Sequence, residues 1–133
     1  WSYILCYFIG NIKMNIQKRL DEFSKFENGW HFNEGVKFDK QVLDTAKDIS
    51  DYCVSIGYDD QEIFPGISGN ILLSVYNGED EIEIGIDENL SFMYFYFSEV
   101  PEDYMNEYDC ETTNLETLKN HILKIKTEMS IDA

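Results

Sequence analysis

The clearest pattern in the sequence is a pair of alternating apolar and polar runs that meet at Asn77-Gly78. An Asn-Gly pair between two such runs is typical of a β-hairpin with a two-residue turn. Pairing outward from that turn predicts Val75 opposite Asp80, Leu73 opposite Ile82 and Ile71 opposite Ile84. One face would then carry Ile71, Leu73, Val75, Ile82, Ile84 and Ile86, and the other Leu72, Ser74, Tyr76, Glu79, Glu81 and Glu83. Because a slip of one residue would turn the glutamates into the core, we expect these faces to be well determined.

A third strand is predicted over Leu90 to Phe97, which is apolar on both faces apart from Ser91. The three residues before it, Asp87 to Asn89, read as a turn in which Asn89 takes the left-handed conformation. This loop length predicts that Leu90, Phe92, Tyr94 and Tyr96 face the core. Met93, Phe95 and Phe97 would then lie beside the row of glutamates.

Helical spacing of apolar residues predicts three helices. The first covers 14–26 and ends at Asn28-Gly29, and the second runs from an N-cap at Asp39 to Gly57. The third follows a capping-box pattern that begins at Thr113. The apolar stripes are Ile16, Leu20 and Phe23 in the first helix, Val42, Ala46, Ile49, Cys53 and Ile56 in the second, and Leu115, Leu118, Ile122, Ile125 and Met129 in the third.

The segments between these elements read as connections. Residues 30–38 suit an extended segment or loop, residues 63–70 a turn-rich approach to the hairpin, and residues 98–112 a polar, acidic connection. The predicted order is therefore α-α-β-β-β-α. It indicates an α+β fold, a three- to four-stranded antiparallel β-meander with helices packed on one face.

The 133 residues suit one domain, which we place at 14–133. Residues 1–13 form an apolar N-terminal extension. Its apolar run, Trp1 to Ile9, is shorter than the roughly 20 residues that span a bilayer and lacks the features of a signal peptide. Upstream sequence, a genuine strand and the stub of a membrane helix all remain open for it.

Negative charge is concentrated in one region of the chain. The net charge is −16, and residues 48–118 hold 18 of the 26 acidic residues and none of the 10 basic ones. Such a field disfavours direct binding of nucleic acid or an anionic membrane and favours a basic protein partner. Three scattered cysteines, Cys6, Cys53 and Cys110, are typical of reduced thiols in a cytoplasmic protein.

No pattern for catalysis or for a cofactor stands out. The cysteines and histidines lack zinc-ligand spacing, and no phosphate-binding or nucleophile motif occurs. A Cys-His pair would have to join Cys53 or Cys110 to His31 or His121, and we expect instead a buried Cys53 and an exposed His121. Trp30 beside His31 reads as a core anchor. We therefore expect no catalytic residue, no cofactor and a protein that is not an enzyme.

The carboxylates leave one chemical alternative. Glu81 and Glu83 lie two apart on one strand and share a face, so with Glu79 or Asp87 they would offer oxygen ligands to Ca²⁺ or Mg²⁺. A solvated strand face is the simpler interpretation, and no metal ligand is assigned.

Two blocks carry a family resemblance. "ENGWHFNEGVKFDKQVLDTAKDI" and "EIFPGISGNILLSVYNGEDEIEIGIDENLSFMYFY" resemble small bacterial proteins of largely unassigned role. These share a Gly-Trp-Asp-Gly-like block, a Pro-x-x-x-Gly-Gly-Ile block and an acidic alternating strand. The matching positions are Gly29, Trp30, Gly35, Ala46, Pro65, Gly69, Ile71, Ile82, Glu83 and Ile84. His31-Phe32, Asn70 and Tyr76 depart from the pattern. The resemblance implies a cytoplasmic protein encoded near mobile-element, toxin or defence genes, and brings over no catalytic residue.

The favoured function is that of a non-enzymatic, acidic protein-binding module, an antitoxin- or immunity-type inhibitor or accessory protein. Its expected partner-binding residues are Leu72, Tyr76, Glu79, Glu81, Glu83, Phe95 and Phe97. Aromatic rings beside carboxylates suit a basic protein surface. One alternative is a nucleic-acid mimic that inhibits a DNA-binding enzyme, and another is a carboxylate metal-binding sensor or small enzyme. A homodimer, or cover by Trp1 to Ile9, would also account for an apolar outer face of the third strand.

Overall fold

A computed structural model describes residues 15–77, 80–97 and 109–131 of the chain. The predicted extension 1–13 and Glu79 lie outside these residues, as do the side chains of Tyr96, Phe97 and Met129. The elements in chain order are α1 (Ile16–Ser24), α2 (Lys40–Ser55), β1 (Asp60–Pro65), β2 (Ile71–Asn77), β3 (Asp80–Ile86), β4 (Phe92–Phe97), β5 (Asp109–Thr112) and α3 (Leu115–Ile131).

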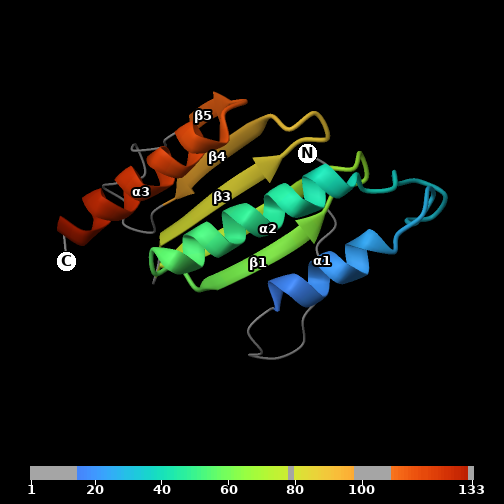
Figure 1. Ribbon diagram of the computed structural model, residues 1–133, viewed down its shortest axis with the longest axis horizontal. Helices are drawn as coiled ribbons and strands as arrows, with labels where there is room; N and C mark the ends of the chain where they lie inside the picture. Colours follow the sequence, from blue (N-terminus) through green and yellow to red (C-terminus); the bar gives the residue numbers. More distant parts are fainter. Residues whose placement is uncertain (1–14, 78–79, 98–108, 132–133) are drawn as a thin grey trace.

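The fold has two layers, a five-stranded antiparallel sheet in the order β1-β2-β3-β4-β5 and three helices on one of its faces (Figure 1). Helix α1 packs against α2 and β1, α2 against β2, and α3 against β5 and α2. The predicted α+β class and antiparallel meander are confirmed. The described sheet is wider than predicted because a strand is added at each edge.

The core lies between these two layers, and the predicted core face of the hairpin is confirmed. Alternation along β2 and β3 turns every second side chain toward the helices. The six residues predicted to face inward, Ile71, Leu73, Val75, Ile82, Ile84 and Ile86, are each at most 1% exposed. From β4, Phe92 and Tyr94 join them, as expected. The helices contribute the apolar stripes that their spacing predicts, including Phe23, Val42, Ala46, Ile49, Cys53, Leu118 and Ile122.

The predicted register of the hairpin is wrong: each residue of β2 pairs with the residue of β3 two positions further along the chain than predicted. Asn77 pairs with Asp80, Val75 with Ile82, and Ile71 with Ile86. Strand β2 therefore extends through Asn77, and β3 begins at Asp80. The observed register places three apolar pairs on the core face, whereas the predicted one would set Val75 opposite a carboxylate. Both registers keep the same residues on each face, because each partner moves by two positions.

The turn between β3 and β4 also differs from the prediction. Leu90, not Asn89, has a left-handed backbone, with φ +63°. The side-chain oxygen of Asn89 instead accepts hydrogen bonds from the Ser91 backbone N–H at 3.1 Å and from its hydroxyl at 2.6 Å. This Asx-type arrangement transfers the positive φ to the next residue, and the half-buried Leu90 side chain packs against the core.

Both edge strands lie where the sequence predicts connections. In β1 the core-facing positions are Gln61, Ile63 and Pro65. Because two of these three are a polar residue and a proline, the apolar alternation typical of a strand is absent from the sequence. Gln61 is 2% exposed and its polar atoms are satisfied inside the core. Its side-chain carbonyl accepts from the Ser50 hydroxyl at 2.5 Å, and its amide donates to the Tyr58 carbonyl at 2.7 Å. Strand β5 has only four residues and is recognisable by its pairing with β4.

The segment between α1 and α2 contains a small hairpin. His31 and Glu34 exchange two backbone hydrogen bonds, and Phe32 and Asn33 form the turn between them with φ +50° and +70°. Trp30 anchors the hairpin to the helical layer. Its ring stacks on Phe26 at 4.8 Å between centroids, and its Nε1–H donates to the Val36 carbonyl at 3.1 Å. Trp30 is therefore a partly buried core anchor, as predicted.

Candidate functional site: the outer face of the sheet

The face of the sheet turned away from the helices combines carboxylates with apolar side chains. In register across β1 to β4, one row is Glu62, Ser74, Glu83 and Phe95. A second row sets Tyr76 beside Glu81, and a third contains Phe64, Leu72, Gly85 and Met93. We call these side chains the outer face: Glu62, Phe64, Leu72, Ser74, Tyr76, Glu81, Glu83, Met93 and Phe95.

The outer face is less open than the sequence pattern suggests. Phe64 is 7% exposed and Ser74 2% exposed. Leu72, Tyr76, Glu81, Glu83, Met93 and Phe95 are half-buried. The large apolar side chains that are most exposed among the described residues, Phe32, Val36, Val54 and Leu123, lie elsewhere. The predicted residues whose side chains the structure describes, Leu72, Tyr76, Glu81, Glu83 and Phe95, therefore face outward, as expected, but as a partly dehydrated surface.

Charge is divided between the two layers of the fold. The five strands contain seven acidic residues and no basic residue, whereas the three helices contain seven of each. The ion pairs among the described residues join helix or loop residues, such as Arg19 with Glu22 and Lys119 with Asp48. None of them involves Glu62, Glu81 or Glu83. The outer face is thus negative without an internal counter-charge in the described part of the chain.

Glu81 and Glu83 form the electrostatic centre of this surface. Partial burial raises the pKa of the Glu83 carboxyl, and the nearby negative charge of Glu81 and a hydrogen bond between the two side chains raise it further. Burial removes the hydration that stabilises a carboxylate, and a second carboxylate repels it. A cation placed here would relieve both effects, so the pair is suited to receive positive charge.

Tyr76 extends the polar network toward β1. Its hydroxyl donates to a carboxylate oxygen of Glu62 at 3.4 Å. Burial raises the pKa of the Tyr76 hydroxyl, and the carboxylates of Glu81 and Glu62 add to the increase. The Tyr76 hydroxyl therefore stays protonated and acts as a hydrogen-bond donor. The ring of the same side chain offers a partner an aromatic contact.

The structure brings together five of the seven predicted partner-binding residues on the outer face: Leu72, Tyr76, Glu81, Glu83 and Phe95. The backbone of Phe97 pairs with Glu81, but its side chain is outside the described set, and so is Glu79. Sequence reasoning missed Glu62 and Phe64, because β1 was not recognised. The acidic and apolar alternation of "DQEIFP" was the signal available for them.

Of the residues considered for catalysis, Cys53 lies in the core and His121 is half-buried. Burial raises the pKa of the Cys53 thiol to about 12, so the reactive thiolate is scarce at neutral pH. The expectation of an exposed His121 is wrong, because its ring contacts Tyr94, whose hydroxyl lies 2.5 Å from His121 Nδ1. In the described residues, no three side chains of His, Cys, Asp or Glu gather as a metal site. Nor is any described helix both long and apolar enough to cross a bilayer.

Comparisons with protein-family models, with curated proteins and with solved structures give no match for this chain. The outer face and the charge distribution are therefore the features that bear on the function of this protein.

Proposed function

We propose that this protein is a non-enzymatic protein-binding module whose outer face receives a basic protein partner. In this proposal it acts in the bacterial cytoplasm as an antitoxin- or immunity-type inhibitor, or as an accessory protein of a toxin or defence locus. The setting rests on the family resemblance of the Gly29-Trp30 and Pro65–Ile71 blocks. The binding activity rests on the surface itself.

One observation supports this function above the others. Glu81 and Glu83 are half-buried, neighbours on one face and without a basic partner among the described residues. Tyr76 lies opposite Glu81 and Phe95 opposite Glu83, and Leu72 lies in the next row. A lysine or arginine of a partner would pair with the carboxylates, while the rings supply contact area. The negative field of the strands would speed encounter with such a partner.

The raised pKa of Glu83 gives the interaction a pH signature. A bound cation favours the ionised carboxylate, so it lowers the pKa of Glu83 and binding releases a proton. We therefore expect the affinity for a basic partner to fall as the pH falls through the raised pKa of Glu83.

The test combines co-purification with matched variants. Proteins encoded beside this gene are co-expressed with the tagged chain, and the affinity of any purified pair is measured at low and at physiological salt. Glu81→Gln with Glu83→Gln is expected to reduce the association rate about tenfold or more and to weaken its salt dependence. Phe95→Ala is expected to accelerate dissociation. Glu116→Gln, which removes a charge from α3 on the other layer, is the control.

Two results contradict the proposal. The first is that no neighbouring gene product binds at low salt. The second is a partner whose affinity responds to Glu116→Gln as strongly as to the variants of the outer face.

A further inference from the structure

The hairpin between α1 and α2 displays an aromatic side chain that the fold does not use. Phe32 is 88% exposed, the largest exposed fraction among the large apolar residues described. It also occupies a backbone position with φ +50°, in a two-residue turn where Asn and Gly are preferred. A phenylalanine at this position lowers the stability of the fold through backbone strain, and its exposed ring adds no stability through burial. An observed outlier of this kind is grounds for assigning a function.

Backbone hydrogen bonds and ring contacts connect the hairpin tip, residues 31–34, to the rest of the fold. At its base the Gly29 N–H donates to the Gly35 carbonyl at 2.8 Å, and the Val36 N–H donates to the Ile67 carbonyl at 2.9 Å in the β1–β2 loop. Consecutive ring contacts run from Phe38 to Trp30 at 6.0 Å, from Trp30 to His31 at 5.9 Å, and from His31 to Phe32 at 4.7 Å. An aromatic anchor that is already ordered binds at a low entropic cost.

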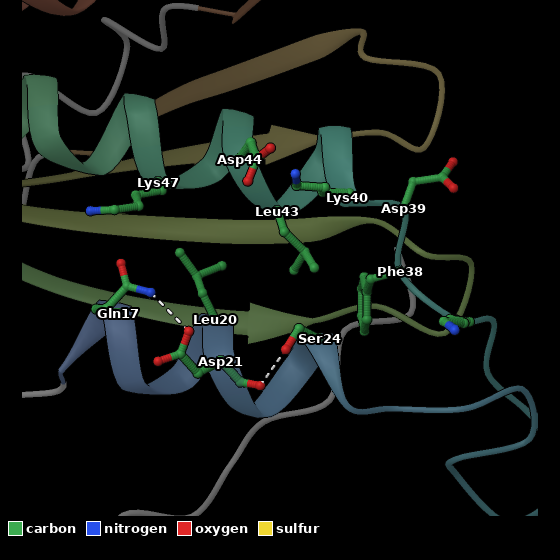
Figure 2. Close-up of a pocket in the computed structure, with 11 residues that line it drawn as sticks. Gln17, Leu20, Asp21, Ser24, Phe38, Asp39, Lys40, Leu43, Asp44 and Lys47 are labelled. Carbon is green, nitrogen blue, oxygen red and sulfur yellow. Dashed lines mark hydrogen bonds between the residues drawn. The ribbon is translucent and has the colours of Figure 1, made fainter.

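A groove of about 590 Å³ lies between α1 and α2, close to this hairpin. Figure 2 shows the side chains of Leu20 and Leu43 projecting from the two helices into the groove, with Phe38 at one end. Three lysines and three aspartates are among the residues that line it: Lys37, Lys40, Lys47, Asp21, Asp39 and Asp44. We call it the α1–α2 groove. Its volume is in the range of pockets that hold ligands, about 300–1,000 Å³, and its floor is apolar.

The part of the chain that forms the hairpin and the α1–α2 groove carries no net charge, so it can approach a second copy without electrostatic repulsion. Residues 15–47 contain six basic and six acidic residues, so they are neutral, and the net charge of −16 comes from the rest of the chain. Two copies that meet here keep their acidic strands apart. The α1–α2 groove is neutral as well, because Asp21, Asp39 and Asp44 balance its three lysines, so it does not repel the hairpin tip of a second copy.

We propose that the protein forms a two-fold symmetric homodimer in which Phe32 of each copy inserts into the α1–α2 groove of the other. A two-fold interface needs one self-complementary patch that holds both a projection and its receptor. Phe32 and Phe38 are six residues apart, so at most about 20 Å of chain separates them. Both features therefore lie within one patch of ordinary interface size. The outer face, on the opposite side of the sheet, stays free, so the dimer is independent of the function proposed above.

Sedimentation velocity of the full chain, from about 1 µM to about 500 µM, tests the proposal. The wild type is expected to form a dimer in this range. Phe32→Ala removes two contacts per dimer, each worth about tenfold or more, so its dissociation constant should rise at least about 100-fold. Phe32→Asn should weaken the dimer equally, and at a concentration where both proteins are monomeric its melting temperature should equal or exceed that of the wild type, because Asn suits a positive φ. Val54→Ala, which shortens another exposed apolar side chain, should leave the dimer intact.

A mixing experiment tests the reciprocal geometry. Ser24 is exposed and lines the α1–α2 groove, so Ser24→Trp is designed to fill it. Neither Phe32→Ala nor Ser24→Trp alone should dimerise. Their equimolar mixture retains one intact contact and should form a heterodimer weaker than the wild-type dimer. A wild type that is monomeric at every concentration, dimers that tolerate Phe32→Ala, or a mixture without heterodimer would each overturn the proposal.

Discussion

Gly35→Ala is expected to be among the most damaging substitutions of a surface residue in this protein. Gly35 has φ +99°, and a Cβ atom built on it would lie 2.6 Å from Nε1 of the Trp30 ring and 2.7 Å from Cε2. Alanine at this position therefore meets two separate costs, an unfavourable backbone conformation and a collision with a packed ring.

The magnitude follows from these contacts. A non-glycine residue with a left-handed backbone costs roughly 1–2 kcal/mol. Displacing Trp30 also breaks its hydrogen bond to the Val36 carbonyl, worth about 1 kcal/mol, and disturbs its stacking on Phe26, worth about another 1 kcal/mol. The expected loss is about 3–4 kcal/mol. For a chain of 133 residues, this lowers the melting temperature by roughly 10–14 °C.

Gly29→Ala is the matched control, because Gly29 lies in the same segment and has a similar φ of +85°. There the nearest atom to an added Cβ is at 3.6 Å, an ordinary contact, so only the backbone cost of about 1–2 kcal/mol applies. Calorimetry compares the two melting temperatures, and Trp30 fluorescence in a Trp1→Phe background reports on displacement of the ring. Equal destabilisation by the two substitutions, with unchanged Trp30 emission, would refute this account of the hairpin.

Three further predictions concern the core and the outer face. Gln61→Leu should destabilise the fold by about 2 kcal/mol, and adding Ser50→Ala should recover part of that loss, because no buried hydroxyl is then left without a partner; urea unfolding of the double-mutant cycle measures this coupling. Because the folded-state pKa of Glu83 is raised, its favourable contribution to stability is complete at low pH and lost as the pH rises through that pKa. Glu83→Gln should therefore be more stable than the wild type near pH 7, with a difference that shrinks as the pH falls toward the ordinary pKa of a glutamate; denaturation that finds the same difference at every pH would show that burial and Glu81 leave Glu83 unperturbed. Cys53, with a pKa of about 12, should react with iodoacetamide near pH 8 only as fast as the fold opens; mass spectrometry that finds rapid labelling of the native protein would disprove its burial.

The alternating hairpin was predictable because buried apolar residues and outward polar residues alternate along β2 and β3. Its register was not, because the turn preference of Asn77-Gly78 competes with the pairing of Ile71 with Ile86 and Val75 with Ile82. Local turn chemistry suggested one alignment, and core packing across the two strands selected the next one.

The edge strands were hidden for different reasons. Gln61 occupies a core position in β1 and is stabilised there by Ser50, which lies 11 residues earlier in the chain on α2. No local pattern reveals such a partner. Strand β5 is short, and its pairing with β4 is a non-local contact.

The candidate site was predictable in its members and not in its environment. Alternation placed Glu81, Glu83 and Phe95 on the outer face. The half-burial of these side chains depends on how the completed sheet is assembled, and the pKa of Glu83 depends on that burial. Glu62 was missed together with its strand.

The division of charge between strands and helices has a consequence for how the molecule moves. Among the described elements, a neutral helical layer on an acidic sheet contributes a permanent dipole moment directed across the two layers. Near a positively charged body the molecule experiences a torque and rotates before contact, presenting the sheet first. At physiological ionic strength this alignment acts only over roughly 8 Å, so it selects orientation in the last moments of an encounter.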